Sequence, residues 1–343
     1  MLIDGIYVPL TAPFYRDGAS YWKKLEHNVG RYSLTPAAGM VALTGEGEAL
    51  SDDEMRQTLT CVSETAAPDK VLVARIAKQS VRGALWLAEE AAKAGLDAVL
   101  LRAPRGLTAV ELRLFLAAVA DGSALPVMLS SAAVDGLPVE VIAEFAQHRN
   151  ALAVFDAGLT VERCRAIQSA TASVKREVTV TTVFAPVTRR MLAVQETATG
   201  SATFVSAESL AGGAAVAVAP PKPAIKTRMK TVGFQMMAAG STAGLVELLA
   251  AGVAGAMPAL AACAPQGCYE AYAAFKDGDP ALAAEKEQRL LAADALLAEL
   301  GVAGIKYGCD LNGYFGGVPR LPRVALDGDQ RAQVERVMQG LRN

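Results

Sequence analysis

The sequence predicts an α/β fold, a (β/α)8 TIM barrel with a C-terminal helical extension and a long insertion after the sixth strand. Three observations support it. Short apolar runs alternate with amphipathic helical stretches through the first half of the chain. No Gly-x-Gly-x-x-Gly follows the first predicted strand, which disfavours a dinucleotide-binding sheet. The 343 residues, 52% of them hydrophobic, are enough for one barrel or for two smaller domains.

Composition narrows the function classes. The formal net charge of -2 gives no global attraction to nucleic acid or to an anionic membrane surface. The first residues contain Asp4 and no basic stretch, so we expect no signal peptide, and the low-charge run 233–264 is expected in the core rather than in a membrane. The five cysteines and two histidines are scattered, which predicts no metal site, no cofactor and a cytoplasmic protein with reduced thiols.

Six βα units follow one another in the first half of the chain. The helix at 52 should begin with a capping box formed by Ser51 and Glu54, and Thr108 with Glu111 has the same spacing. The expected strands lie at residues 5–10, 39–43, 71–74, 98–101, 126–129 and 151–154. The expected helices lie at residues 21–32, 51 onward, 81–94, 108–120, 138–147 and 160–170.

Consecutive βα units require a parallel sheet with helices outside it, either open or closed into a barrel. A barrel places its chemistry at the carboxyl ends of its strands, so the residues at those positions decide function. They are residues 9–11, 44–46, Arg75, Arg102, Ser130 and 155–156.

Several motifs at these positions resemble the dihydrodipicolinate synthase / N-acetylneuraminate lyase family of pyruvate-handling aldolases, and most of all its 4-hydroxy-2-oxoglutarate aldolase branch. Residues 5–14 (GIYVPLTAPF) are similar to the family's first strand and its "TPF" turn, and 44–46 (TGE) with 50–54 (LSDDE) resemble its "GTTGE…LSDEE" motif. Residues 252–256 (GVAGA) resemble its eighth strand. Its C-terminal region is similar to 313–317 (GYFGG) and 319–322 (PRLP).

The resemblance implies a lysine that forms a Schiff base with pyruvate at the end of the sixth strand, where this chain has Phe155. The family's proton-relaying tyrosine at the end of the fifth strand corresponds to Ser130. The first threonine of "GTTGE" corresponds to Leu43, and the second is kept as Thr44. Residues 102–106 (RAPRG) replace the segment that carries the tyrosine of a neighbouring subunit. The ordinary mechanism therefore cannot run through these positions.

Cations stand near the strand ends in place of that machinery. One interpretation is that Arg75, Lys78 and Arg102 bind an anionic ligand, or that Lys78 supplies a relocated imine-forming amine. The alternative is that both arginines pair with acids of the barrel mouth, namely Glu46, Glu48 or Asp156. Asp156 is also a candidate general base or helix cap. The predicted ligand-binding residues are Thr11, Thr44, Arg75, Lys78, Arg102, Ser130 and Asp156. We expect three of them, Thr11, Thr44 and Ser130, to lie in one pocket with Phe155.

The stretch between the sixth and seventh strands is longer than a βα unit needs. We expect an insertion at about 172–232 that contains a strand at 177–184 and ends in a basic segment with Lys222 and Lys226. Residues 239–241 are the preferred match to the turn after the seventh strand, although 200–202 resembles it too. The expected division is a barrel over 1–265 and a helical region over 266–343.

Two functions remain open. The first is a lyase that acts on or binds a small keto acid or another anionic metabolite without the standard Schiff base. The second is a catalytically silent binding or regulatory subunit. A barrel for phosphate ligands outside this family is a weaker third, because the C-terminal motifs speak against it. We also expect a homo-oligomer, a dimer or tetramer, through apolar residues near the fourth helix: Leu107, Leu112, Leu114 and Phe115.

Overall fold

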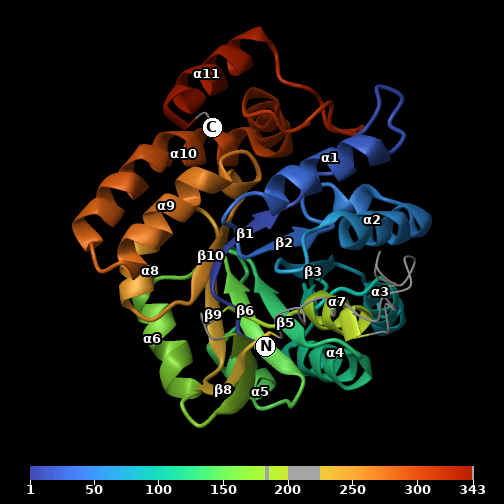
Figure 1. Cartoon of the computed structure of the whole chain (residues 1–343), viewed down its shortest axis with the longest axis vertical. Coiled ribbons are helices and arrows are strands. Elements are labelled where there is room, and N and C mark those ends of the chain that lie inside the picture. Colours follow the sequence, from blue (N-terminus) through green and yellow to red (C-terminus); the bar gives the residue numbers. More distant parts are fainter. Residues whose placement is uncertain (182–184, 200–224, 342–343) are drawn as a thin grey trace, which may run out of the picture.

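Eight parallel strands close into a barrel, as the sequence predicts (Figure 1). The structure is a computed structural model and describes residues 1–181, 185–199 and 225–341. Around the barrel the strand order is β1-β10-β9-β6-β5-β4-β3-β2. The barrel strands are β1 (Gly5–Pro9), β2 (Gly39–Ala42), β3 (Val71–Ile76), β4 (Ala98–Leu101), β5 (Val127–Ser131), β6 (Ala151–Asp156), β9 (Gln235–Gly240) and β10 (Gly255–Pro258).

Helices cover the outside of the barrel. Both predicted capping boxes are confirmed: Ser51 and Thr108 accept bonds from the backbone N–H groups of Glu54 and Glu111, whose carboxylates bond back. The outer helices are α1 (Trp22–Ser33), α2 (Asp52–Thr65), α3 (Val81–Lys93), α4 (Ala109–Gly122), α5 (Val139–Ala146), α6 (Val161–Ala170) and α8 (Leu245–Ala250). Short 3₁₀ turns lie at η1 (Gly47–Ala49), η2 (Ala259–Ala262) and η3 (Gln339–Leu341).

The strands are buried on both faces because helices cover the outside and side chains fill the inside. β2, β4 and β6 are buried along their whole length, as is usual for parallel strands. Alternate residues of the strands pack against the helices in one large cluster. The others pack against each other inside the barrel, and the largest of these interior side chains are Tyr7, Leu100, Met128, Phe155 and Met237. The barrel therefore has a packed centre and no open channel through that layer.

The insertion lies between α6 and the seventh barrel strand. β9 (Gln235–Gly240) is that strand, so the preferred match at 239–241 is confirmed over the one at 200–202, which falls outside the described residues. The expected strand at 177–184 is β7 (Arg176–Thr181); residues 182–184 are outside the described part. It pairs antiparallel with β8 (Thr227–Val232), and α7 (Arg189–Thr199) lies between them in sequence.

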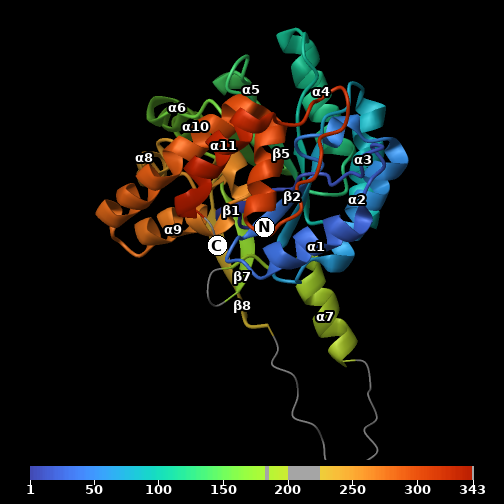
Figure 2. The ribbon, with the colours of Figure 1, turned by 90° about the horizontal axis from the view of Figure 1, so that it is seen from above.

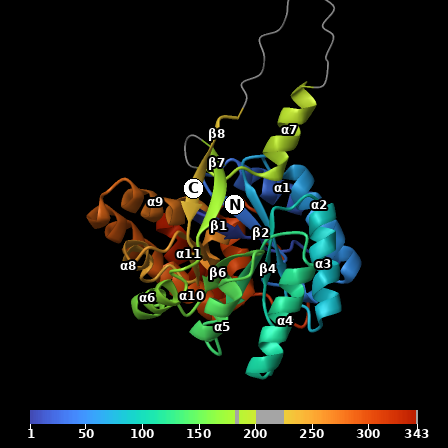
Figure 3. The same cartoon turned by 90° about the horizontal axis from the view of Figure 1, so that it is seen from below.

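The insertion contacts the end of the barrel where the strands begin. Thr188 and Arg190 donate hydrogen bonds to the carbonyl oxygens of Pro68 and Lys70, just before β3. The backbone N–H of Arg189 donates to the Asp97 carboxylate, just before β4. Figures 2 and 3 show α7 and the β7–β8 pair projecting from the same side of the molecule. The insertion thus leaves from the face opposite the carboxyl ends of the strands.

Three further helices complete the chain: α9 (Pro265–Lys276), α10 (Pro280–Leu311) and α11 (Gly328–Met338). α10 is interrupted at Gly301, whose φ of 62° is a left-handed conformation that glycine adopts without strain. After α10 the chain returns to the carboxyl ends of the strands, where Arg320 contacts the β2 loop. Among the described residues, no helix has the length and apolar character needed to cross a membrane.

Candidate functional site: an arginine-lined pocket at the barrel mouth

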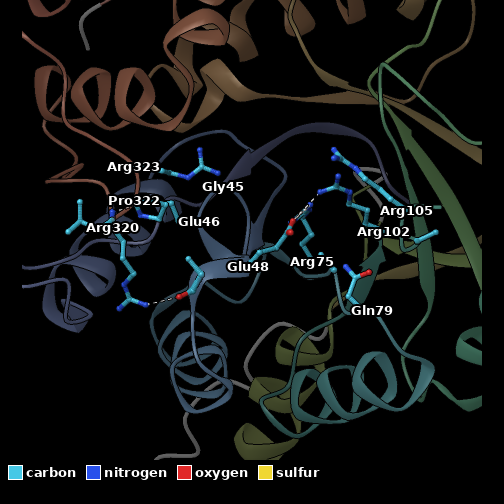
Figure 4. Close-up of a pocket in the computed structure, with 14 residues that line it drawn as sticks. Gly45, Glu46, Glu48, Arg75, Gln79, Arg102, Arg105, Arg320, Pro322 and Arg323 are labelled. Atoms are coloured by element: carbon cyan, nitrogen blue, oxygen red, sulfur yellow. Dashed lines mark hydrogen bonds and ion pairs between the residues drawn. The ribbon is translucent and has the colours of Figure 1, made fainter. Parts of the chain in front are cut away.

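A pocket of about 1040 Å³ lies at the carboxyl ends of β2, β3 and β4. Loops after these strands form its floor and one wall, and the C-terminal segment 320–323 forms another (Figure 4). Five arginines contribute to the lining together with two glutamates. The charged residues are Glu46, Glu48, Arg75, Arg102, Arg105, Arg320 and Arg323.

Arg75 and Arg102 point into the pocket because of strand periodicity. Arg75 lies two residues after Val73 on β3, and Arg102 lies two residues after Leu100 on β4; Val73 and Leu100 both face the barrel interior. Both guanidiniums donate to Oε1 of Glu48, over 3.0 Å and 3.1 Å. Of the paired acids considered from the sequence, Glu48 is the one that these arginines contact.

Glu46 is held quite differently from Glu48. Its carboxylate lies 2.5 Å from the Lys306 ammonium, and both side chains are essentially inaccessible to solvent. Lys306 comes from α10, donates to the Val318 carbonyl oxygen and lies over the Phe14 ring at 4.5 Å. Burial lowers the pKa of Lys306, and the hydrogen bond to Glu46 partly offsets this effect. Glu46 therefore connects the loop after β2 to α10 through a buried ion pair.

Arg320 fixes the C-terminal segment to the barrel. Its guanidinium donates to both carboxylate oxygens of Glu54 over 2.5 Å and 2.8 Å, a two-bond geometry that suits the planar guanidinium. It also donates to the carbonyl oxygens of Gly18 and Ala49, and its backbone N–H donates to Glu46. The Arg320 bond holds the pKa of Glu54 at about 2. This arginine is thus committed to structure.

Thr11 and Thr44 do not line the arginine pocket. They border a separate cavity of about 20 Å³, room for about one water molecule, beside α1. The Thr44 hydroxyl donates to the Leu10 carbonyl oxygen over 2.7 Å. Leu43 has a φ of 63°, which is uncommon for leucine, and its side chain packs in the outer cluster. Thr11 and Thr44 share this cavity, but Ser130 and Phe155 do not line it, so the prediction that all four lie in one pocket is wrong.

Phe155 lies on the inner side of β6, in the packed barrel centre, and is fully buried. Its ring meets that of Tyr7 edge to face, with 5.9 Å between centroids. Ser130 is its neighbour in the β5–β6 register and is partly buried. Lysine is absent from both positions, and the surrounding side chains in this layer are apolar.

The other predicted site residues lie outside the pocket lining. Lys78 pairs with Asp52 over 2.6 Å and lies over the Trp86 ring. Asp156 pairs with Arg163 over 2.7 Å and accepts a bond from the Gly158 N–H, so it orders the start of the next helix. Lys226 directly precedes β8 on the opposite face, and Lys222 lies outside the described residues.

Sequence reasoning did not assign a role to Lys306, Arg105 or Arg323. Arg105 and Arg323 stand in loops, where no periodicity indicates direction. Lys306 had one usable signal, since it is the single charge in a stretch of small and apolar residues, 300–309. No group of three or more His, Cys, Asp or Glu side chains in the described part of the chain is placed to hold a metal ion.

Comparison with known proteins agrees with this architecture. The profile of the dihydrodipicolinate synthetase family matches residues 2–195 and 222–341. The 4-hydroxy-tetrahydrodipicolinate synthase of Acidiphilium cryptum (strain JF-5) is 27% identical over 348 residues, which cover 99% of each chain. The corresponding enzyme of Rhizobium meliloti (strain 1021) is 30% identical over 169 residues, 47% of this chain and 56% of that protein.

Solved structures show the same fold. A putative dihydrodipicolinate synthetase from Pseudomonas aeruginosa superposes with a TM-score of 0.77 at 20% identity, over 99% of this chain and 100% of that one. A prophage protein of the dihydrodipicolinic acid synthase family from E. coli K12, in complex with pyruvate, gives 0.75 at 20% identity over 99% of both chains. With the family profile matching most of its residues, this chain belongs to the dihydrodipicolinate synthetase family.

Proposed function

We propose that the arginine-lined pocket binds a small 2-oxo acid or a similar anionic metabolite, and that the protein acts on it without a Schiff base at residue 155. The observation that carries this proposal is the position of Arg75 and Arg102, one side-chain layer beyond the apolar centre that contains Phe155. Guanidiniums bind carboxylates well and stabilise negative charge that develops on a neighbouring carbonyl oxygen. The family to which the chain belongs supports an aldolase-like lyase.

The side chains at the family's catalytic positions support the absence of imine chemistry. Phe155 has no amine, and Ser130 replaces a phenol by a hydroxyl of much higher pKa. Lys78 is already engaged by Asp52, and Lys226 starts from the opposite face of the barrel. Lys306 is enclosed between Glu46 and Phe14.

Borohydride reduction in the presence of pyruvate, followed by intact mass and peptide mapping, tests whether any lysine forms a Schiff base. We expect no reduced adduct on any lysine and negligible condensation of pyruvate with aspartate semialdehyde. Phe155→Lys alone should restore neither adduct formation nor condensation, because Ser130 still lacks the phenol and Leu43 lacks a hydroxyl. A labelled peptide that contains Lys78, Lys222, Lys226 or Lys306 would overturn the proposal and restore imine chemistry through another amine.

Anion binding is tested separately by calorimetric titration with 2-oxo acids. We expect Arg75→Gln to weaken binding at least about tenfold, because the guanidinium supplies charged hydrogen bonds to the ligand carboxylate. Lys78→Gln is the matched control, a cation of the same strand end that does not line the pocket. Binding without turnover of any 2-oxo acid would favour the alternative of a binding or regulatory subunit.

The proposal includes two further expectations, a cytoplasmic location and a homo-oligomer. All five cysteines are free thiols, which suits a cytoplasmic protein. A homo-oligomer through the α4 region is supported by Leu114 and Val110, whose exposed fractions are 66% and 64%. Phe115 was expected on that surface but packs inward. One structural relative is described as a monomeric dihydrodipicolinate synthase variant, so light scattering at micromolar concentration is the deciding measurement.

A further inference from the structure

Glu48 occupies the place where an anion would bind. One of its oxygens, Oε1, accepts from both Arg75 and Arg102. Because both donors share that oxygen, neither pair has the two-bond geometry that Arg320 and Glu54 form nearby. The Glu48 side chain is 49% exposed, whereas those of Arg75 and Arg102 are 14% and 28% exposed. The arginines are thus held by the barrel, and the acid between them is free to leave toward solvent.

The pocket has more positive charge than Glu48 balances. Arg320 is committed to Glu54, and Glu46 is committed to Lys306. Arg105 and Arg323 also line the pocket, and within the described residues neither side chain has a hydrogen-bond or ion-pair partner. In Figure 4, Arg105 lies near Arg102, and Arg323 lies on the other side of Glu48. Four arginines therefore face one available carboxylate.

We propose that Glu48 is an internal ligand of this site, and that one acidic group of a doubly charged 2-oxo acid replaces it between Arg75 and Arg102. The second acidic group of that ligand is then bound by Arg105, which lies on the Arg102 side of the pocket. This inference rests on the proposed function and adds the charge class of the ligand and the residue that the ligand displaces.

The exchange explains why a second acidic group matters. When a ligand carboxylate replaces the Glu48 carboxylate, one ion pair is lost for each that forms, so a monoanion gains little from this step. A dianion makes the same exchange and also gains a contact with Arg105, which had no partner. Competition by Glu48 therefore weakens the binding of both classes of acid, and the contact with Arg105 favours the doubly charged one.

Two 2-oxo acids of equal length test the charge class. 2-Oxoglutarate and 2-oxopentanoate differ only in whether the last carbon is a carboxylate or a methyl group. In calorimetric titrations of the whole chain we expect 2-oxoglutarate to bind about tenfold more tightly, with the ratio falling as salt is raised. In Arg105→Gln the ratio should fall toward one. Equal affinities in the unmodified protein would overturn this inference while leaving the proposed function intact.

Glu48→Gln tests the displacement itself. It keeps the size of the side chain and removes the charge that competes, so affinity for both acids should rise about twofold to tenfold. Asp53→Asn is the control with the same change in net charge, since Asp53 is 81% exposed and pairs with Arg56 outside the pocket. Weaker binding in Glu48→Gln would show that Glu48 only braces the arginines. Failure of both acids to bind either protein would overturn the proposed function as well.

Discussion

Arginines stand at both ends of the barrel, but they bind different kinds of acceptor. At the end where the strands begin, Arg176 donates to the carbonyl oxygens of Ala146, His148 and Ala151, and Arg190 donates to main-chain oxygens as well. At the mouth, Arg75 and Arg102 share one oxygen of Glu48. Main-chain acceptors cannot leave without unfolding, whereas a half-exposed side chain can rotate away. The first pair fixes the fold, and the second is the pair that we propose binds a ligand.

The largest effect on stability should come from the buried pair at the mouth. Lys306→Met leaves the Glu46 carboxylate buried without a counter-charge, and we expect a loss of about 3–5 kcal/mol in the free energy of unfolding. Denaturant unfolding measures it. The double variant with Glu46→Gln should recover much of the loss, because no unpaired charge then remains. A loss of no more than about 1 kcal/mol in Lys306→Met, the value expected for an exposed ion pair, would contradict the assignment of this pair to the rigid part of the mouth.

The next prediction compares the stability effects of arginine variants at the two ends of the barrel. Arg176→Ala should lower stability by about 1–3 kcal/mol, because partly buried carbonyl oxygens lose a charged donor. Arg102→Ala should change stability by no more than about 1 kcal/mol, since its ion pair is partly exposed. Binding of 2-oxoglutarate should respond in the opposite order, with a loss in Arg102→Ala only. Similar stability losses in both variants would remove the distinction between fixed and exchangeable arginines.

A smaller, pH-dependent effect concerns Glu54. Its pKa is held at about 2 by Arg320, below the ordinary value of 4.5. A carboxyl with a lowered pKa stabilises the fold fully above the ordinary value, and this contribution is lost as pH falls toward 2. Between pH 5 and about 2, the unmodified protein should therefore lose about 1–2 kcal/mol more than Glu54→Gln, after allowance for solvent screening. Parallel acid titrations of unfolding would contradict this assignment.

The fold was predictable because it depends on repeated patterns. Apolar runs of strand length alternate with capped amphipathic helices, and the ends of those runs predicted that Arg75 and Arg102 lie at the barrel mouth. Local departures from those patterns account for the errors at the mouth. Leu43 would follow Val41 to the interior by alternation, but its left-handed backbone turns it outward, and Thr44 then reaches the Leu10 carbonyl oxygen. A single sequence has no signal for that backbone conformation.

Contacts between residues far apart in the sequence were also not predictable. Glu46 and Glu48 are separated by one residue and look equivalent, yet Lys306, far along the chain, buries one and leaves the other exposed. Which acid is enclosed depends on where the C-terminal segment returns to the barrel. The resemblance of residues 313–322 to the family's C-terminal region indicated that a return takes place, but not its contacts.

The ladder between β7 and β8 has a consequence for chain entropy. β6 ends at residue 156 and β9 begins at 235, about 80 positions later, and yet the two strands are neighbours in the barrel. Closing a flexible connection of that length costs about 1 kcal/mol more than closing one of about 20 residues. Pairing of Arg176 with Val232 brings the two ends of the insertion together. The seventh strand then reaches the sixth through a connection of ordinary βα length, so the number of residues between β7 and β8 can vary with little effect on barrel closure.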